Sequence, residues 1–253
     1  MKRPARIRLD QLLVDRGLVE SRTRAQSTIM AGRVRVDGQV VSKSGTRVEA
    51  EADITCAEPP PFVSRGGQKL AAALAEFGIS PAGRVCLDAG ASTGGFTDCL
   101  LKNGASRVYA VDVGYGQLDD RVANDPRVVV MDRTNVRHLP PSDLPETMDL
   151  VVGDLSFISL TLVLPALAGV MRPDAEMVLL VKPQFEVGRE NVGKGGIVRD
   201  EAAREGAIER VVTAAAELGL SLSGRMTSPI TGAKGNVEFL IHLTRGNTLE
   251  AHP

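Results

Sequence analysis

The chain has 253 residues, of which 43% are hydrophobic and 24% charged, and its formal net charge is −1. This composition is typical of a globular protein and excludes a disordered or collagen-like chain. Because the length exceeds that of a usual single domain, we expect one large and one small domain. Asp154 and Pro165 interrupt the most apolar stretch, residues 150–171, and no apolar run follows the basic start, so neither a membrane span nor a secretion signal is predicted.

The cysteines and histidines do not indicate a disulfide framework or a metal site. The three cysteines are an odd number without a CxxC pair, and His138, His242 and His252 lack the spacing of metal ligands. We therefore expect a cytoplasmic protein that needs no metal.

Basic residues concentrate at the start of the chain. Residues 1–47 hold eleven lysines and arginines against four acidic residues, so the remainder of the chain is acidic. Such a segment favours nucleic-acid binding, although a solvated, charge-rich face would have the same composition.

Two short helices and a hairpin are predicted in this basic segment. The spacing of the apolar residues predicts a first helix that ends near Gly17, and a second helix should begin after the cap Ser21. Asp37 and Gly38 predict the turn of a hairpin. The apolar positions of the first helix are Ile7, Leu9, Leu12, Leu13 and Leu18. In the second helix we expect Ala25, Ile29 and Met30 to face inward and Arg22, Arg24 and Gln26 to face outward.

The motifs RLDQLL and SRTRAQSTIMAGRVRVDGQVV resemble the S4 RNA-binding domain, and we assign residues 1–57 to it. The resemblance implies binding to structured RNA through phosphates and 2'-hydroxyls, without a row of stacking aromatics. The candidate RNA contacts in this domain are Arg6, Arg22, Arg24, Gln26, Arg33, Arg35 and Lys43.

A proline-rich break, EPPPFVSRGG at residues 58–67, is predicted to be the linker between the domains, and Arg65 within it is a further candidate RNA contact. Residues 68–253 alternate helical and strand patterns, which predicts an α/β domain with a seven-stranded, mostly parallel sheet and helices on both faces. The strands are expected at residues 84–88, 107–112, 127–131, 148–154, 175–182, 220–227 and 236–243.

The glycine-rich stretch LDAGASTGGFTD, residues 87–98, follows the first of these strands. It lacks the Gly-Lys-Ser/Thr ending of a P-loop, and Ser92 replaces the second glycine of a dinucleotide turn. Asp112 ends the next strand about 20 residues later, where an acid can bind ribose hydroxyls. The loop therefore favours a nucleoside ligand.

Four successive strands end in a carboxylate, at Asp88, Asp112, Asp132 and Asp154. Four acids would repel a pyrophosphate and attract a sulfonium cation such as that of S-adenosylmethionine, although acids in these places are also common as helix caps. The loop resembles the first motif of the methyltransferases that use this donor. The cofactor residues that we expect are Asp88, Gly90, Ser92, Thr93, Gly94, Gly95, Phe96, Asp112, Asp132 and Asp154.

A lysine, Lys182, ends the strand that reads as fully buried, AEMVLLV. Desolvation would lower the pKa of its ammonium group and a neighbouring Asp154 would raise it, so the sequence leaves its protonation open. Together with Lys69 and Glu238 these residues resemble the K-D-K-E tetrad of the FtsJ-like ribose 2'-O-methyltransferases. With SRGGQKL, VGDLSFISL, VKPQFE and GNVEFL, the resemblance extends to the TlyA-type rRNA methyltransferases, also called the hemolysin A family.

This resemblance implies a Rossmann-like enzyme that transfers a methyl group from S-adenosylmethionine to a ribose 2'-hydroxyl, with cytidines of 16S and 23S rRNA as the family's targets. It implies that Lys182 orients or deprotonates the 2'-hydroxyl, that Asp154 positions Lys182 and the donor, and that Lys69 and Glu238 hold the ribose. Ribosomal RNA or ribosomal subunits are then the partners, with no membrane, no metal and no obligate protein partner.

The glycine-rich stretch from residue 187 to the helix cap Asp200 reads as an RNA-contacting lid, with Arg189 and Lys194 facing phosphates, or as a mobile connection. Tyr115, Phe157 and Phe185 are candidates for stacking on adenine or on the target base, with core packing as the alternative for the two phenylalanines.

Three other functions fit the sequence less well. A pseudouridine synthase would lack the nucleoside loop, and an enzyme that methylates base amines usually has two prolines where this chain has DLSF. A membrane-lysing toxin would need an amphipathic or secreted segment, which the sequence does not predict.

Overall fold

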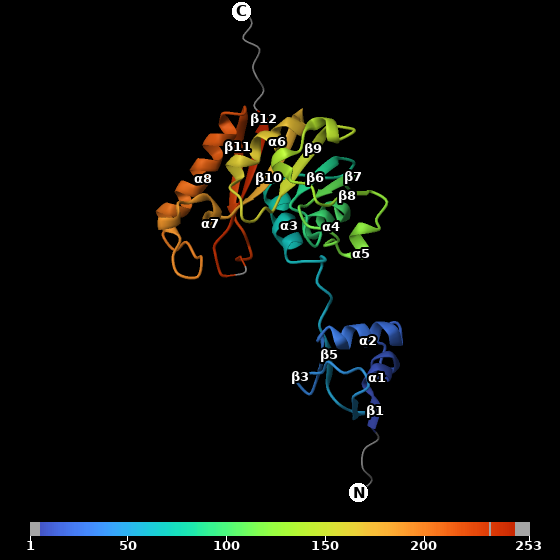
Figure 1. The fold of residues 1–253 in the computed structure, drawn as a ribbon. Coiled ribbons are helices and arrows are strands. Elements are labelled where there is room, and N and C mark those ends of the chain that lie inside the picture. Colours follow the sequence, from blue (N-terminus) through green and yellow to red (C-terminus); the bar gives the residue numbers. More distant parts are fainter. Residues whose placement is uncertain (1–5, 233, 246–253) are drawn as a thin grey trace, which may run out of the picture. The chain divides into compact units, whose positions relative to one another are not determined.

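The computed structural model describes residues 6–232 and 234–245, apart from the side chain of Arg189. The chain divides into two compact units, Met1–Pro60 and Pro61–Pro253, and each is described by itself (Figure 1).

The first unit is a small α+β fold, as the sequence predicts. Its elements are β1 (Arg6–Arg8), α1 (Leu9–Asp15), α2 (Arg22–Met30), β2 (Val34–Val36), β3 (Gln39–Val40), β4 (Arg47–Glu49) and β5 (Ile54–Cys56). Strand β1 pairs with β4, and β2 lies between β3 and β5, all antiparallel. The cap at Ser21 is confirmed, because its side chain accepts a hydrogen bond from the Arg24 amide, and Asp37 and Gly38 have the positive φ angles of the predicted turn.

Three predictions for this unit are wrong. Leu18 lies beyond α1 and is 41% exposed, whereas we expected it at an apolar position of the first helix. Ile7 lies in β1 rather than in the first helix, which begins at Leu9. Met30 is 71% exposed, whereas we expected it to face the core. Neighbouring side chains on a helix point about 100° apart, so with Ile29 fully buried the last helical residue, Met30, points outward.

A buried carboxylate, Asp10, organises the basic surface of the first unit. It accepts two hydrogen bonds from Arg8, at 3.0 and 2.8 Å, and others from Arg22 at 3.3 Å and Gln26 at 3.1 Å. The Arg8 guanidinium holds the pKa of the Asp10 carboxyl well below its usual range. A single acid therefore joins β1, α1 and α2.

The second unit is an α/β domain with a seven-stranded sheet, as predicted. Its strands are β6 (Val85–Ala89), β7 (Arg107–Val111), β8 (Val128–Met131), β9 (Met148–Gly153), β10 (Met171–Val181), β11 (Leu220–Thr227) and β12 (Phe239–Arg245). Its α-helices are α3 (Gly66–Phe77), α4 (Gly95–Lys102), α5 (Asp120–Ala123), α6 (Leu164–Val170), α7 (Pro183–Glu186) and α8 (Glu201–Ala216). The 3₁₀ helices are η1 (Val136–His138), η2 (Pro141–Asp143), η3 (Leu160–Leu162) and η4 (Arg189–Asn191).

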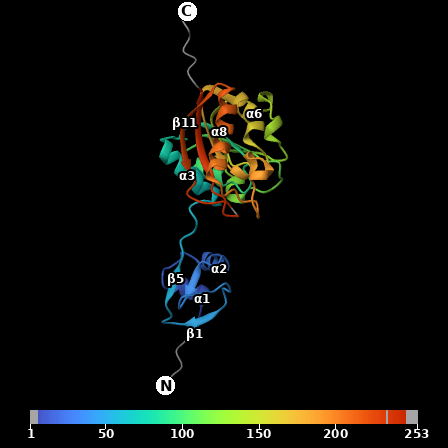
Figure 2. The same cartoon turned by 90° about the vertical axis from the view of Figure 1, so that its left-hand side faces the viewer.

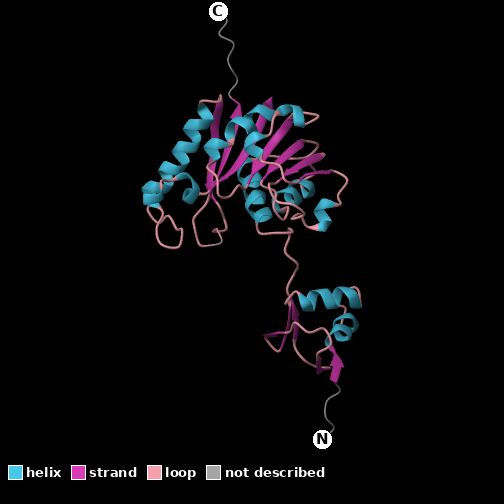
Figure 3. Cartoon of the chain, viewed as in Figure 1, coloured by secondary structure: helices cyan, strands magenta, loops and turns pink. Residues whose placement is uncertain are grey.

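Two hydrophobic layers enclose this sheet (Figures 2 and 3). Helices α3 and α4 pack on one face, through residues such as Leu70 and Leu100. Helices α6 and α8 pack on the other face, through residues such as Leu167 and Val211. None of the helices between residues 6 and 245, Ala233 apart, combines the length and the hydropathy that crossing a membrane requires.

The strand order, β11-β12-β10-β9-β6-β7-β8, places the switch of winding direction between β6 and β9. The strands from β10 to β8 are parallel, and β12 runs antiparallel between β10 and β11. Connections leave β6 and β9 in opposite directions, so a crevice forms at their carboxyl ends. This is where the glycine-rich loop and Asp154 lie.

The segment that we assigned to the linker becomes part of the second unit before residue 67. Helix α3 begins at Gly66, and the amide of Val63 donates a hydrogen bond of 2.9 Å to Asp98 in α4. A Cβ atom on Gly95 would lie 2.2 Å from the Ser64 hydroxyl oxygen, so glycine permits this close approach.

The Asp10 network predicts a selective loss of stability. We expect Asp10→Ala to lower the free energy of unfolding of the first unit by about 1–3 kcal/mol, because three side chains lose their acceptor. The carboxyl pKa is depressed by folding, so this stabilisation is complete above about pH 4 and is lost as the pH falls below it. Hydrogen exchange of residues 6–57 in the full chain measures both effects. Asp15→Ala, which removes only an exposed contact with Gln11, is the control and should change little; equal effects of the two substitutions would contradict the role of Asp10.

Gly90, the first glycine of the loop after β6, gives a second prediction. Its φ is +80°, and a Cβ atom there would lie 3.0 Å from the backbone oxygen of Asp154. We expect Gly90→Ala to lower the free energy of unfolding by about 1–2 kcal/mol. Gly206→Ala, in the open middle of α8, should raise it by about 0.5–1 kcal/mol. Chemical denaturation followed by circular dichroism measures both, and effects of the same sign would contradict the strained turn at Gly90.

Candidate active site

Three hollows open at the carboxyl edge of the sheet, around the crevice between β6 and β9. Their volumes are about 550, 190 and 340 Å³. All three share two lining residues, Asp154 and Ser156, which directly follow β9. The loop after β9 is therefore the wall at which they meet.

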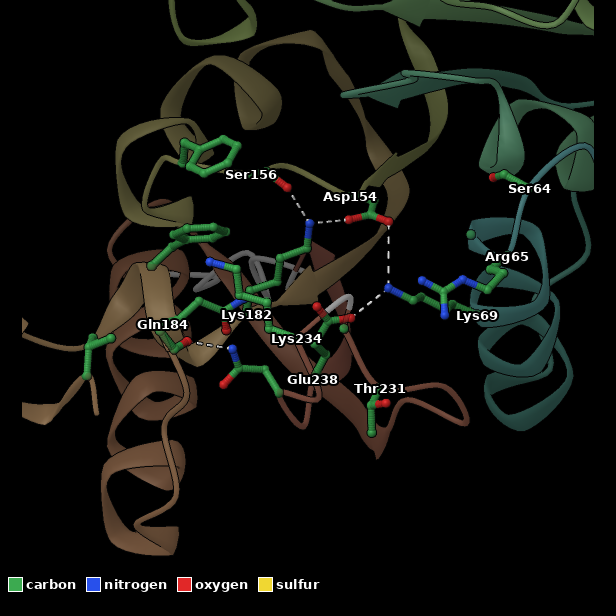
Figure 4. Close-up of a pocket in the computed structure, with 17 residues that line it drawn as sticks. Ser64, Arg65, Lys69, Asp154, Ser156, Lys182, Gln184, Thr231, Lys234 and Glu238 are labelled. Carbon is green, nitrogen blue, oxygen red and sulfur yellow. Dashed lines mark hydrogen bonds and ion pairs between the residues drawn. The ribbon is translucent and has the colours of Figure 1, made fainter. Parts of the chain in front are cut away.

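Four charged side chains gather in the largest hollow (Figure 4). Lys69 Nζ donates a hydrogen bond of 2.6 Å to Glu238 Oε2 and lies 3.9 Å from Asp154 Oδ2. On the other side of Asp154, Lys182 Nζ lies 2.6 Å from Oδ1. The structure thus brings together Lys69, Asp154, Lys182 and Glu238, which are up to 169 residues apart in sequence.

The sheet register explains why these residues meet. In the antiparallel pair of β10 and β12, Val181 lies opposite Phe239, so Lys182 and Glu238, the next residues outward, are neighbours. In the parallel pairs Gly153 lies beside Ala89 and Leu179, so Asp154 leaves the sheet between the glycine loop and Lys182. Lys69 reaches the same point from the buried face of α3.

Burial makes the pairing of these charges necessary. Lys69, Lys182 and Glu238 are each less than a tenth exposed. An unpaired charge in such a place would be costly, and two lysines with two acids balance one another. The cluster is therefore a compensated network whose open side is the hollow.

The two smaller hollows follow the glycine-rich loop. One is bounded by Asp112, Gln117 and apolar residues that include Val113 and Val136. The other is bounded by loop residues, Ser64 and Gly66. Because both also contain Gly90, Ser92 and Asp154, they suit an elongated ligand with a nucleoside at one end and a small polar group at the other.

Most of the expected cofactor residues line these two hollows, and three do not. Those that do are Gly90, Ser92, Thr93, Gly95, Phe96, Asp112 and Asp154. Asp88, Gly94 and Asp132 are absent from the linings. Gly94 has a φ of +88° and shapes the start of α4, and Asp132 accepts a hydrogen bond from the Gly116 amide.

Asp88 lines none of the three hollows, and its contact with the cofactor stays a prediction. Its side chain is fully buried and accepts a hydrogen bond of 2.6 Å from Thr97 in α4. Burial raises the pKa of Asp88 to about 7, which the bond from Thr97 opposes. Asp88 belongs to β6 itself, whose pleat turns it toward α4, whereas the other three acids lie one residue beyond their strands.

The four acids do not form the open cluster that the sequence suggested. Asp112 accepts hydrogen bonds from the amides of Ser92, at 2.8 Å, and Gly114, at 2.7 Å. Asp154 is paired with two lysines. Because these carboxylates are already bonded to other groups of the protein, they hold the loops in place as well as attracting a cation.

Two buried polar residues that we did not predict fix the loops around the largest hollow. The Asn236 side chain donates to the Gly196 oxygen at 2.7 Å and accepts from the Val198 amide at 2.9 Å. Glu186 accepts from the Ser159 hydroxyl at 2.6 Å and from the Leu160 amide at 2.8 Å, and burial raises the pKa of its carboxyl. Both residues lie in motifs quoted from the sequence, GNVEFL and VKPQFE, but the motifs do not indicate which groups these side chains bond to.

The glycine-rich segment before α8 borders the largest hollow through Val192 and Gly196. It contains η4 and a bridge between Gly193 and Ile197, and Asp200 caps α8 as predicted. Lys194 is exposed, and the side chain of Arg189 lies outside the described part of the chain. Arg65 lines the largest hollow.

Of the three aromatic residues predicted to stack on a base, Phe157 and Phe185 line the largest hollow, and Tyr115 lines none of the three. Phe157 is 91% exposed with a φ of 64°, and its ring centroid lies 5.3 Å from that of Phe185. Core packing is therefore excluded for Phe157. Tyr115 is exposed and stacks on Arg133, 4.3 Å from ring centroid to guanidinium.

The predicted RNA contacts of the first unit differ in their exposure and in whether they are already hydrogen-bonded within the protein. Arg6, Arg24, Arg35 and Lys43 are exposed, and Arg33 is half-buried. Arg22 and Gln26 point outward as expected but are bonded to Asp10. Asp10 is the acid of the RLDQLL motif, so the motif pointed to this residue, whereas the count of charged residues did not.

The histidines have other surroundings than a metal site. His242 is buried and stacks on Phe77, 5.5 Å between centroids, and burial lowers the pKa of its imidazole. Within residues 6–232 and 234–245, His, Cys, Asp and Glu side chains form no group of three that could hold a metal ion. His252 lies outside the described residues.

Comparisons with known proteins match both units. Residues 62–245 fit the sequence profile of the FtsJ-like methyltransferases, and residues 7–54 fit that of the S4 domain. The chain is 51% identical to the 16S/23S rRNA (cytidine-2'-O)-methyltransferase TlyA of Mycobacterium tuberculosis H37Rv, over 94% of this chain and 90% of that protein. It is 42% identical to a protein named Hemolysin A from Brachyspira hyodysenteriae, over 93% and 99% of the two chains.

A solved structure from Streptococcus thermophilus is also similar, at 43% identity and a TM-score of 0.74, over 96% of this chain and 89% of that one. The profile match covers well over half of the chain, and it coincides with the unit that holds the three hollows. This protein belongs to the FtsJ-like methyltransferase family and carries an S4 domain before its methyltransferase domain.

Proposed function

We propose that this protein transfers a methyl group from S-adenosylmethionine to the ribose 2'-hydroxyl of a cytidine in ribosomal RNA. The observation that carries the proposal is the network of Lys69, Asp154, Lys182 and Glu238, which opens into the largest hollow where that hollow meets the two along the glycine loop. The relative from Mycobacterium tuberculosis is named for this activity.

The two smaller hollows fit S-adenosylmethionine. Asp112 stands at the side of one hollow, where a carboxylate can accept hydrogen bonds from ribose hydroxyls, and Val113 and Val136 offer apolar walls to a base. The loop from Gly90 to Gly95 and Ser64 bound the space left for the amino-acid end. When bound, S-adenosylmethionine supplies a methyl group whose bond to a positively charged sulfur breaks with the electron pair left on sulfur.

Lys182 is the residue that we assign to the ribose 2'-hydroxyl. Its Nζ is nearly buried, is paired with Asp154 and lines the largest hollow. From there it orients the hydroxyl and receives or passes on the proton as the new oxygen–carbon bond forms. Because a ribose hydroxyl is a weak nucleophile, alignment and proton removal are the main tasks of the protein.

Lys69 and Glu238 hold the other side of the ribose. Their hydrogen bond of 2.6 Å fixes both side chains in the wall of the hollow, and Asp154 links Lys69 to Lys182. The wall also contains Gln184 and Thr231, whose polar side chains are suited to hydrogen bonds with a nucleotide.

The first unit supplies affinity for RNA. Exposed Arg6, Arg24, Arg35 and Lys43 can meet phosphates, and Arg22 and Gln26 are held in place by Asp10. In the second unit, Arg65, Arg189 and Lys194 are the proposed contacts, with the segment before α8 as a lid on the RNA. Ribosomal RNA is the substrate that the name of the Mycobacterium tuberculosis relative gives, and we propose it, free or in ribosomal subunits, for this protein.

Loss of Lys182 tests the proposal. We expect Lys182→Ala to lower the rate of 2'-O-methylation of purified ribosomal subunits by about 10²–10⁴-fold, because the hydroxyl loses the amine that orients it and accepts its proton. Radiolabelled S-adenosylmethionine followed by nucleoside analysis measures the product. Calorimetry with the same variant is the control, since donor binding should persist. A methylated base with an unmodified ribose, or full activity of the variant, would overturn the proposal.

Phe157 gives a second test of how the target is bound. Its exposed ring lines the largest hollow and can stack on a base, so we expect Phe157→Ala to raise the KM for RNA by about tenfold. The KM for S-adenosylmethionine should stay within about twofold if the base is the partner. A rise in that second KM alone would instead place adenine against Phe157, which also lines the donor hollow.

A further inference from the structure

The geometry points to Ser156 as a positioning residue for the methyl transfer: its hydroxyl sets the direction in which the Lys182 amine faces the ribose. This inference rests on the proposed function and adds a member to the network of Lys69, Asp154, Lys182 and Glu238. Ser156 lies in the loop after β9, in DLSF, and no feature of the sequence pattern singled it out.

The contact between Ser156 and Lys182 is directional. Lys182 Nζ donates a hydrogen bond of 2.7 Å to Ser156 Oγ (Figure 4). Nζ also lies 2.6 Å from Asp154 Oδ1, which carries the opposite charge. Asp154 therefore balances the charge of Lys182, and Ser156 adds a neutral, directional contact that fixes the orientation of the amine.

The tetrahedral geometry of Nζ shows what this orientation achieves. One corner carries the side-chain carbon, one N–H points at Ser156, and a third corner is next to Asp154. Among the residues that the structure describes, no further acceptor contacts Nζ, and the nitrogen borders the largest hollow. The fourth corner of Nζ is thus left for the ribose hydroxyl. In the charged amine this corner is an N–H that donates to the ribose oxygen, and in the neutral amine it is a lone pair that accepts the hydroxyl proton.

The loop that carries Ser156 is fixed at both ends. At its start, the Asp154 amide donates to the Ala89 oxygen at 3.1 Å. At its end, Glu186 of α7 accepts from Ser159 and Leu160. Because α7 begins directly after Lys182, the Glu186 contacts tie the serine and the lysine to the same pair of elements. The 2.7 Å contact is preorganised before any substrate binds.

Ser156 has no role in packing that would explain its place. The residue is exposed, and it lines all three hollows where donor and acceptor must meet. Removing its hydroxyl would leave no cavity in the core. An effect on methyl transfer would therefore come from Lys182 and not from the stability of the fold.

Steady-state kinetics of Ser156→Ala test the inference. We expect kcat for 2'-O-methylation of ribosomal subunits to fall about 10-fold to 100-fold, with both KM values within about threefold of the unchanged protein. Ser156→Thr, which keeps the hydroxyl, should restore kcat to within about threefold. Thr161→Ala is the matched control: its hydroxyl is also in this loop but bonds to Ser159, so kcat should be unchanged.

A double-mutant cycle separates this inference from the proposed function. In single-turnover measurements, Ser156→Ala should have no further effect on a protein that already carries Lys182→Ala, because the serine acts through the lysine. Unchanged kcat in Ser156→Ala, a raised KM without loss of kcat, or additive effects of the two substitutions would overturn the role of Ser156. Full activity of Lys182→Ala alone would overturn the proposed function instead.

Discussion

The pairing of one carboxylate, Asp154, with two nearly buried lysines is the interaction on which the site depends. Each of its oxygens meets a different ammonium group, from α3 on one side and from the end of β10 on the other. Buried ion pairs give little net stability, because removing the charges from water costs about as much as their attraction returns. Their value here is geometric: Lys69 and Lys182 can stay in place only if the elements that carry them converge on Asp154.

The topology of the sheet makes this convergence possible. Parallel strands β6, β9 and β10 end at one edge, and β12 enters between β10 and β11 in the opposite direction, so that Glu238 arrives at that edge just before its strand begins. The glycine loop then has to turn away from β6 within a very short space. Gly90 packs against the backbone of Asp154, and so the two smaller hollows and the ion-pair network share one wall. The close approach of the two loops brings methyl donor and acceptor together in the proposed reaction.

The strength of the sequence prediction varied with the kind of signal. Long apolar runs predicted all seven strands to within a few residues, and the order of the four charged residues, read as a family resemblance, predicted which side chains meet. Asp88 differs from the other three acids because it lies within the paired part of β6, and the end of β6 is not visible in the sequence. Met30 failed because it follows the buried Ile29 on the helix and so points about 100° away from it. Ser156, Glu186 and Asn236 had no periodic signal, since their partners come from distant segments.

In each unit a carboxylate holds basic side chains in fixed positions. In the first unit a buried acid, Asp10, holds Arg8, Arg22 and Gln26 with their heads still partly in water. In the second, Asp154 holds two lysines at the wall of a hollow. A flexible cationic side chain loses conformational entropy when it meets RNA, and an acid that orders it beforehand removes part of that cost from binding. The acid also lowers the net positive charge, so affinity that depends on charge alone becomes weaker. An arrangement of this kind therefore favours targets whose phosphates and hydroxyls match the fixed cations over RNA in general.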